Sequence, residues 1–306
     1  MRAFLIALLA LSVLAGSARA DGLPVLGVDV GAEGVTTEAA AVRYVTIPDG
    51  RVTIVAQTAR SGGQIVGLTR LRGSFTVPAV AYDGSASGLS ADGRVLVLIE
   101  PRQSFPRADT TFAVLDAPRL RDTRVFTLRG DFSFDALSPD GSTMFLIQYV
   151  DPSDPDRYAV RAYDLSAGRL LAKPVVDPHE QGAAMRGKPL TRTTSADGRW
   201  AYTLYDGGGG TPFVHALDTA GRTAHCVDLP QLAGRRDLWQ LRLNRADGGK
   251  AIRVGDVVTI STQGFTVEHS RSPNALPAAA GVSVVLALLL GLVFAGRVSS
   301  RLRARP

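Results

Sequence analysis

Cysteine and histidine are scarce in this chain. Its 306 residues include one cysteine, Cys226, and four histidines. A single cysteine excludes an internal disulfide, so the apolar core must stabilise the fold. Cys226 stands in a strand-like stretch and is interpreted as a small buried residue, with a reactive thiol or an intermolecular bridge as alternatives. No His-x-x-His spacing, Ser-His-Asp order or Glu pair is visible, so no metal, cofactor or catalytic residue is predicted, although distant repeats could still assemble a site.

An excess of one charge is also absent from the central part of the chain. The formal charge is +6 at pH 7, but residues 21–275 hold 28 basic and 28 acidic side chains. The excess lies in the two ends, which contain no acids: Arg2, Arg19, Arg297, Arg301, Arg303 and Arg305. A neutral central domain lacks the electrostatic basis for binding phosphates, so no nucleic-acid partner is expected.

The first 20 residues have the pattern of a secretory signal peptide. A positive start is followed by an apolar run over 5–15 and by Ala18-Arg19-Ala20, which fits a cleavage box. An uncleaved N-terminal anchor is the alternative, although the apolar run is short for a membrane span. The mature chain is expected to begin at Asp21, outside the cytoplasm.

The C-terminus contains a second apolar block, at 276–296. This block is 21 residues long and uncharged, which matches the length of a transmembrane helix. Because arginines follow it directly, the tail 297–306 is expected inside the cell. Residues 21–268 then form an extracytoplasmic domain, joined to the membrane by a short tether, 269–275. A buried core helix and a cell-wall sorting signal are the alternatives, although Leu276-Pro277 lacks the Thr-Gly pair that sortases cut.

One short pattern recurs through the middle of the chain. Five times, an Asp-Gly turn follows a short apolar run and precedes an alternating one. Glycine accepts positive φ and the Asp side chain bonds its own backbone, so the pattern predicts tight hairpins. The turn residues are Asp49, Asp92, Asp140, Asp197 and Asp247, spaced 43, 48, 57 and 50 residues apart.

Each repeat is expected to form four antiparallel strands. The third repeat predicts strands at 132–137, 143–150, 158–164 and 169–176, the fourth at 190–194, 200–205, 212–217 and 222–229, and the last at 239–243, 251–254, 257–262 and 265–268. Four strands per 40–50 residues indicate an all-β fold, a β-propeller. Five blades are expected, with six as the alternative, and Pro24 to Val30 could supply a closing strand.

These repeats resemble the TolB-like and YVTN-type bacterial propellers, relatives of the WD-repeat fold. The resemblance rests on the Ser-x-Asp-Gly turns and on strands that end at Asp164 and Asp218 before a small-residue turn. It covers roughly residues 40–268 and implies a propeller, but its motif is structural and nearly silent on function. The Trp-Asp and Gly-His dipeptides of WD repeats are missing, and the first and last turns depart from Ser-x-Asp-Gly.

The long polar loops are predicted to emerge on one face of the propeller, because the tight Asp-Gly turns occupy the other. Binding residues commonly lie on loops held by a rigid scaffold, and an ordinary solvated rim is the alternative interpretation. The acidic loop 151–156 has two prolines and lacks the Gly and Glu of an EF-hand, so it is interpreted as a stiff loop. The candidate ligand-binding residues are Arg102, Arg107, Asp151, Asp154, Asp156, Asp177, His179, Glu180, Arg235 and Arg236.

The sequence therefore predicts an extracytoplasmic propeller held in the cell membrane by one helix. It is expected to act as a binding module for an envelope protein or ligand rather than as an enzyme. The alternative is a propeller hydrolase or lactonase with a metal or polar site on the long-loop face.

Overall fold

The chain is all-β in the computed structural model, which describes residues 34–37, 41–61, 63–180, 182 and 184–269. These residues contain no α-helix, only short 3-10 turns (η1, Gly207–Gly209; η2, Pro230–Leu232; η3, Leu238–Gln240; η4, Asp247–Gly249). Within this part of the chain, no helix is long and apolar enough to cross a membrane. The expected signal peptide, tether and membrane helix, and the strand expected at 24–30, lie outside the described residues.

The strands form five antiparallel sheets that follow one another along the chain. Sheet 1 contains β1 (Val42–Asp49), β2 (Val52–Ala59) and β3 (Ile65–Arg72). Sheet 2 contains β4 (Val95–Ile99), β5 (Asp109–Asp116) and β6 (Arg121–Arg129). Sheet 3 contains β7 (Phe132–Leu137), β8 (Thr143–Tyr149), β9 (Arg157–Asp164), β10 (Arg169–Val175) and the short β11 (Ala184–Arg186).

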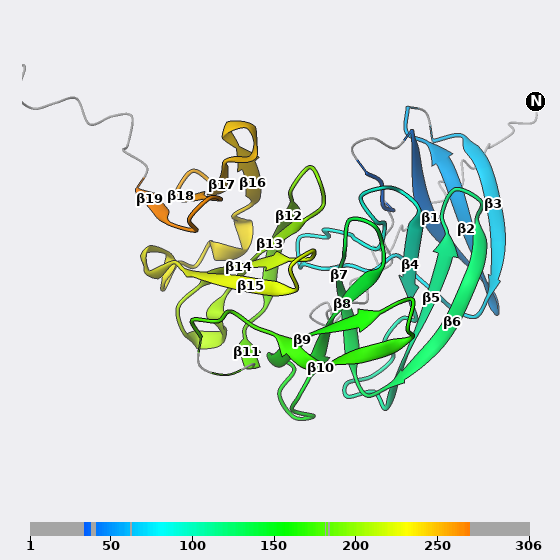
Figure 1. The fold of residues 1–306 in the computed structure, drawn as a ribbon, viewed down its shortest axis with the longest axis horizontal. Helices are drawn as coiled ribbons and strands as arrows, with labels where there is room; N and C mark the ends of the chain where they lie inside the picture. Colours follow the sequence, from blue (N-terminus) through cyan, green and yellow to red (C-terminus); the bar gives the residue numbers. More distant parts are fainter. Residues whose placement is uncertain (1–33, 38–40, 62, 181, 183, 270–306) are drawn as a thin grey trace, which may run out of the picture.

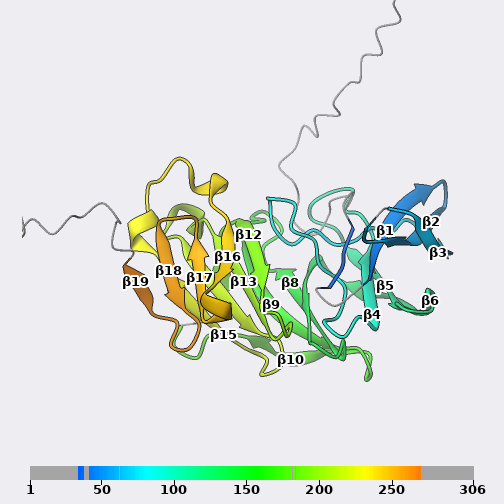
Figure 2. The same cartoon turned by 90° about the horizontal axis from the view of Figure 1, so that it is seen from above.

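The two C-terminal sheets have four strands each. Sheet 4 contains β12 (Pro189–Thr194), β13 (Trp200–Tyr205), β14 (Phe213–Asp218) and β15 (Thr223–Asp228). Sheet 5 contains β16 (Leu243–Ala246), β17 (Ala251–Val254), β18 (Val258–Ser261) and β19 (Val267–His269). Each sheet is a meander, except that β11 also pairs with β9 in sheet 3, and the sheets succeed one another in an arc (Figures 1 and 2). This is the blade-by-blade organisation that the repeat predicted.

Burial identifies the inner and outer strands of each blade. All six residues of β7 are buried, whereas most of β10, the last long strand of the same sheet, is exposed or half-buried. β3 and β6 are likewise the most exposed strands of their sheets. A chain that starts each blade at the centre and ends it at the rim is the meander of a propeller.

Four apolar cores separate the five sheets. Each core is built from side chains of two successive sheets, as Leu96 and Val55 show for sheets 1 and 2, and Ile252 and Val214 for sheets 4 and 5. The cores between sheets 2 and 3 and between sheets 3 and 4 follow the same rule. Among the described residues, no hydrogen-bonded strand pairing joins sheet 5 to sheet 1. In the described part of the chain, the blades therefore form an open arc with sheets 1 and 5 as its two ends.

The Ser-x-Asp-Gly motif makes the same turn in three blades. In the third blade Ser138 Oγ donates to Asp140 Oδ1 over 2.6 Å and accepts from Thr143 N over 2.9 Å, while Ser142 N donates to Asp140 Oδ1. The turns at Ser90 and Ser195 repeat this arrangement. These bonds satisfy backbone N–H groups that the hairpin would otherwise leave unpaired. Asp92, Asp140 and Asp197 each accept these bonds within an Asp-Gly hairpin turn.

The first and last Asp-Gly turns differ from the prediction. Val35 pairs with Tyr44, so β1 is the second strand of its blade and the Asp49-Gly50 turn joins strands two and three. It therefore lies on the long-loop face, where sheet 2 has its loop 100–108. Asp247 is part of the 3-10 turn η4, with φ +50°. Neither signature contains the serine on which the Ser-x-Asp-Gly bonds depend.

A second repeat, Leu-Arg-Gly-x-Phe, marks the passage from one blade to the next. It occurs at 71–75 and at 128–132. Thr53 Oγ1 donates to Gly73 O and accepts from Phe75 N, and Thr110 makes the same pair of bonds with Gly130 and Phe132. The linker glycine has positive φ in both copies, where a Cβ would meet the phenylalanine ring. The link between blades is thus a hydrogen-bonded turn with a defined conformation rather than a flexible loop.

A hairpin over 78–87 interrupts the inner strand of sheet 2 and crosses to sheet 4. Thr76 and Leu89 pair with β4 on either side of it. At its tip, Tyr82 N donates to Pro189 O over 2.9 Å and Asp83 N donates to Leu190 O over 3.1 Å. The hairpin therefore ties two blades together that are not neighbours along the arc.

Strand boundaries agree best with the prediction in the third and fourth blades. β7, β13 and β17 match it residue for residue. The strand expected at 239–243 is wrong, because Leu238–Gln240 form a 3-10 turn and the strand begins only at Leu243. Trp239 is 64% exposed, so its aromatic character was a misleading sign of a strand.

Candidate functional site

The predicted ligand-binding residues do not converge on one pocket. Arg102 is buried and donates to Asp131, with its guanidinium 4.6 Å from the ring centroid of Tyr149. Arg107 also contacts Asp131, through its backbone N–H at 2.9 Å. Burial, with the neighbouring Arg102, lowers the pKa of Arg107 to about 10. These arginines hold the β4–β5 loop against the start of β7.

The acidic loop 151–156 is tied to the end of β11 and to the residues just after it. Asp154 pairs with Arg186, and Asp156 Oδ2 lies 2.8 Å from Lys188 Nζ. Asp151 accepts from the hydroxyl and the backbone N–H of Ser153, which lowers the pKa of its carboxyl. Asp154 and Asp156 are thus paired with basic side chains and Asp151 is bonded within the loop, as expected for a stiff loop.

The two arginines of the β15–β16 link lie apart from both groups. Arg235 pairs with Asp237 two residues later, with its Nη2 2.6 Å from Oδ2. Arg236 is exposed. Exposed pairs of this kind contribute little to stability.

The third group of predicted residues gathers along the outer edge of sheet 4. After β10 the chain runs beside β15, where Ala224 N donates to Val176 O over 3.3 Å. Asp177 Oδ2 then accepts from Cys226 N over 2.7 Å. The carboxylate thus takes the place of the backbone carbonyl that a neighbouring strand would offer to this N–H. Burial would raise the pKa of Asp177, but hydrogen bonds from the backbone of His179 and Cys226 outweigh it and the pKa is lowered. Asp177 is therefore a buried, oriented carboxylate at neutral pH.

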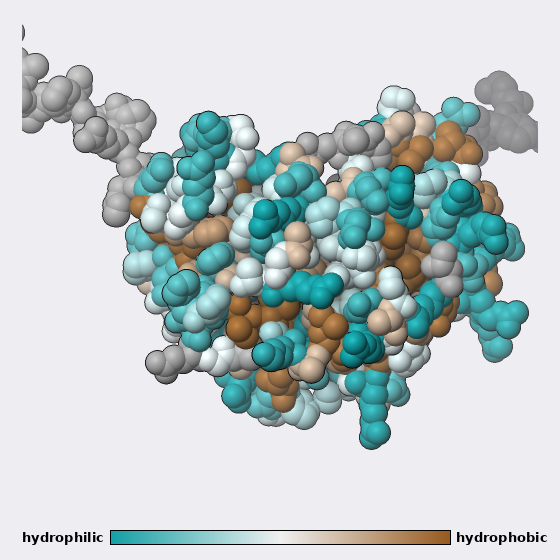
Figure 3. Space-filling view, viewed as in Figure 1, coloured by the Kyte–Doolittle hydropathy of each residue, from teal (hydrophilic) through white to brown (hydrophobic). Residues whose placement is uncertain are grey.

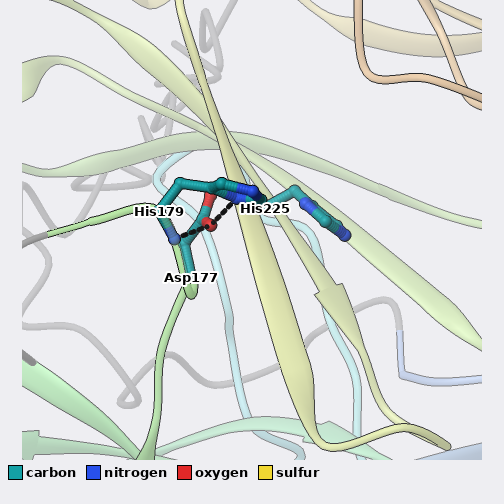
Figure 4. A group of neighbouring side chains, drawn as sticks. All are labelled: Asp177, His179 and His225. Carbon is teal, nitrogen blue, oxygen red and sulfur yellow. Dashed lines mark hydrogen bonds and ion pairs between the residues drawn. The ribbon is translucent and has the colours of Figure 1, made fainter.

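His179 bonds to this carboxylate, and His225 lies beside the two residues (Figure 4). His179 Nδ1 lies 2.9 Å from Asp177 Oδ1, and its backbone N–H donates to the same oxygen. His225 projects from β15 and stacks on Phe265, with ring centroids 4.5 Å apart. The three residues can offer one ligand atom each with all three atoms within 4.8 Å of one another. We call these three residues the Asp-His-His cluster.

A pocket of about 240 Å³ lies beside this cluster, between sheets 3 and 4. Apolar side chains from both sheets line it, and Asp177, Glu180 and Asp228 add carboxylates. Arg186 is the basic residue in the lining and already pairs with Asp154. The apolar lining residues include Val175, Val176, Ala184, Met185 and Phe213. A pocket of this size and lining fits one apolar side chain or a small cationic molecule.

His215 and Cys226 lie side by side in the wall of the pocket. Cys226 Sγ is 3.7 Å from His215 Nδ1. Burial lowers the pKa of His215 to about 4 and, with Asp177 nearby, raises the pKa of Cys226 to about 12. Both groups are therefore neutral near pH 7, the reverse of a thiolate–imidazolium pair. Cys226 is therefore better described as a small packed residue than as a reactive thiol.

The assignment of long loops to one face named Asp177, His179 and Glu180 as candidates but did not include His225 or the pocket. His225 is 46 residues after His179, and only the pairing of the link with β15 brings them together. Strand alternation over 223–228 was the available signal. It places His225 and Cys226 on opposite faces of sheet 4, the first toward sheet 5 and the second toward sheet 3.

Comparisons with known proteins return no match to a family model or to a curated protein. Among solved structures, TolB from Acinetobacter baumannii is 14% identical over 74% of this chain and 50% of that one, with a TM-score of 0.42. This chain thus spans half of that TolB. A functionally unknown protein from Desulfotomaculum acetoxidans is 14% identical (77% and 67% covered, TM-score 0.45). A putative 6-phosphogluconolactonase from Bacteroides uniformis is 16% identical (78% and 68%, TM-score 0.43). At these low scores the architecture rests on the strand order and the four cores.

Proposed function

We propose that this chain is a membrane-tethered, extracytoplasmic binding module whose free face of sheet 1 binds an envelope protein. The observation that carries the proposal is the contrast between the two end faces of the arc. A stack of repeats usually covers its ends with polar residues, because an uncovered apolar face costs solubility. The two ends of this arc differ in that respect.

Sheet 1 presents an apolar end face. The strand register places Val45, Ile47, Ile54 and Leu68 on the side opposite Tyr44 and Val55, which pack against sheet 2. Leu68 is 56% exposed and Ile65, in the next row, is 51% exposed. No described element covers this face, and Figure 3 shows hydrophobic atoms at this end of the molecule, at upper right. Such a surface is typical of a protein interface.

Sheet 5 presents a polar end face. Its apolar residues point toward sheet 4, and Asn244, Arg253, Thr259 and Glu268 form the opposite side. A polar face would bury unpaired groups if it packed against the apolar face of sheet 1. The two faces are therefore mismatched for closing the ring, and sheet 1 is left to bind another molecule.

Charge indicates the kind of partner. Arg43, Arg70 and Arg72 border the apolar face, and the one acidic residue on it is Asp49, whose Oδ2 lies 3.6 Å from Arg70 Nη2. A partner with an apolar stripe and acidic margins would complement this surface. A second copy of the chain would oppose arginine to arginine, so a different protein is favoured.

The experiment compares two substitutions that add the same charge to opposite ends. Leu68→Asp lies on the apolar face and Asn244→Asp, also exposed, lies on the polar one. In membranes solubilised in mild detergent, the wild-type chain and Asn244→Asp should migrate in a native complex larger than the monomer. Leu68→Asp should migrate as the monomer with an unchanged melting temperature. Loss of the complex in both variants or in neither would contradict the proposal, and a chain extractable without detergent would contradict the tether.

The enzyme alternative is supported by one feature, the pocket between sheets 3 and 4. Its carboxylates and the adjacent Asp-His-His cluster could serve hydrolysis if a metal were bound. We retain it as the second candidate, because the arrangement has no nucleophile activated by a neighbouring base among the described residues.

A further inference from the structure

We propose that the Asp-His-His cluster binds one zinc-like divalent cation at the outer edge of sheet 4. Asp177 and His179 come from the β10–β12 link and His225 from β15, so the fold unites donors from two separate segments. The proposal is independent of the protein partner suggested for sheet 1, which lies at the other end of the arc.

The donor geometry is close to that of a bound ion. Zinc takes nitrogen at about 2.0–2.1 Å and carboxylate oxygen at about 2.0–2.2 Å in a tetrahedral array, which places donor atoms roughly 3.3 Å apart. In the cluster all three donor atoms lie within 4.8 Å of one another, and the Asp177–His179 pair is at 2.9 Å. Each donor-to-donor distance then has to change by at most about 1.5 Å for the three atoms to reach a tetrahedral ion. His179, whose side chain is 82% exposed, can move in this way without disturbing the core.

Two of the three ligands are already held in place. Asp177 is fixed through its second oxygen by the Cys226 N–H, which leaves Oδ1 directed at His179. The His225 ring packs against Phe265 and near Trp200, at 4.5 and 6.1 Å between ring centroids. Partners of this kind orient metal ligands and limit the entropy lost when the ion binds.

The donor set selects the class of metal. Two imidazoles and one carboxylate suit zinc and its borderline neighbours, whereas calcium and magnesium prefer sites made of oxygen. Three protein ligands leave a fourth position, and the exposure of His179 places that position toward solvent. Such an open site can accept a water molecule or a donor from a bound molecule.

Zinc titration of the full chain, purified without a histidine tag and treated with chelator, tests the site. We expect one Zn²⁺ per chain by calorimetry, and Co²⁺ should give the intense visible absorption of a four-coordinate site. His179→Ala should weaken zinc binding at least tenfold, because even the loss of an outer partner costs about 10- to 100-fold. Its side chain is 82% exposed and its contacts are with Asp177 and His225, inside the cluster, so the melting temperature without metal should change little.

Glu180→Gln is the matched control, because it removes an adjacent exposed charge without touching the cluster. It should leave zinc affinity within about twofold. His225→Gln should weaken binding as His179→Ala does, and if it fails to fold, His179→Ala decides. Absence of stoichiometric zinc binding, or equal affinity in wild type and His179→Ala, would overturn the proposal and leave Asp177 and His179 as a hydrogen-bonded turn.

Discussion

At the scale of single residues, burial decides which charged groups remain available for binding. Arg102 was expected on an open face, but its side chain is 1% exposed and its charge is matched by Asp131. Arg192 and Asp135 form a second buried pair, between sheets 4 and 3. Removing one member of such a pair leaves an uncompensated charge, so these arginines are poor candidates for ligand contacts. Sequence alone could not distinguish these buried arginines from the exposed Arg236, because both the buried and the exposed arginines have polar neighbours in the sequence.

His215 predicts a pH dependence of stability. Its pKa falls from 6.5 to about 4 on folding because burial disfavours the charged ring. The unfolded chain therefore binds the extra proton between these values, and stability falls as pH decreases from about 6.5 toward 4. The loss amounts to about 3 kcal/mol over the whole window. Urea unfolding at several pH values should give a shallower slope for His215→Leu than for wild type, and equal slopes would contradict the assignment.

At the scale of elements, the sequence predicted the blades that carry the whole Ser-x-Asp-Gly motif. Serine, aspartate and glycine act within five residues of one another, so the local sequence contains the turn. The prediction failed at the first blade, where Asp49-Gly50 lacks the serine and turns the chain at a different place in the meander. It also missed the hairpin 78–87, whose partner Pro189 is a hundred residues away. Strand register within a blade depends on residues that are close in sequence. Contacts between blades join residues that are far apart in sequence, so local patterns do not reveal them.

Gly93 and Gly141 occupy equivalent turn positions, so alanine at each site separates two effects on stability. One is the backbone strain of positive φ, and the other is steric crowding of the added Cβ. Gly93 and Gly141 have φ of +71° and +69°. A Cβ at Gly93 would meet open space, whereas one at Gly141 would lie 2.6 Å from Val95 Cβ. Gly93→Ala should cost about 1 kcal/mol from backbone conformation alone. Gly141→Ala should cost roughly 1–3 kcal/mol more, because the two blades must separate.

Chemical denaturation of the two variants measures this difference directly. Equal losses of unfolding free energy would show that the turn of sheet 3 does not press against sheet 2. That result would contradict the tight contact between these blades at the Asp-Gly face.

At the scale of the whole molecule, the described residues form a row of five blades with unlike ends. Four cores join the blades in sequence order, and one hairpin links sheets 2 and 4 across the row. The Asp-His-His cluster lies near one end and the apolar face of sheet 1 lies at the other. The repeat period predicted five blades, with six as the alternative, and the described residues form five sheets. The character of the end faces became visible only once the register had assigned each side chain to one side of its sheet.

The most direct test of this account places a photoreactive amino acid at position 68 and, as control, at position 268. Leu68 lies on the apolar face of sheet 1, and Glu268 lies on the polar face of sheet 5, each on the outermost strand of its sheet. After irradiation of intact cells, we predict a discrete cross-link from position 68 to another envelope protein and none from position 268. No cross-link from position 68, or the same products from both positions, would contradict the claim that the free face of sheet 1 is the binding surface.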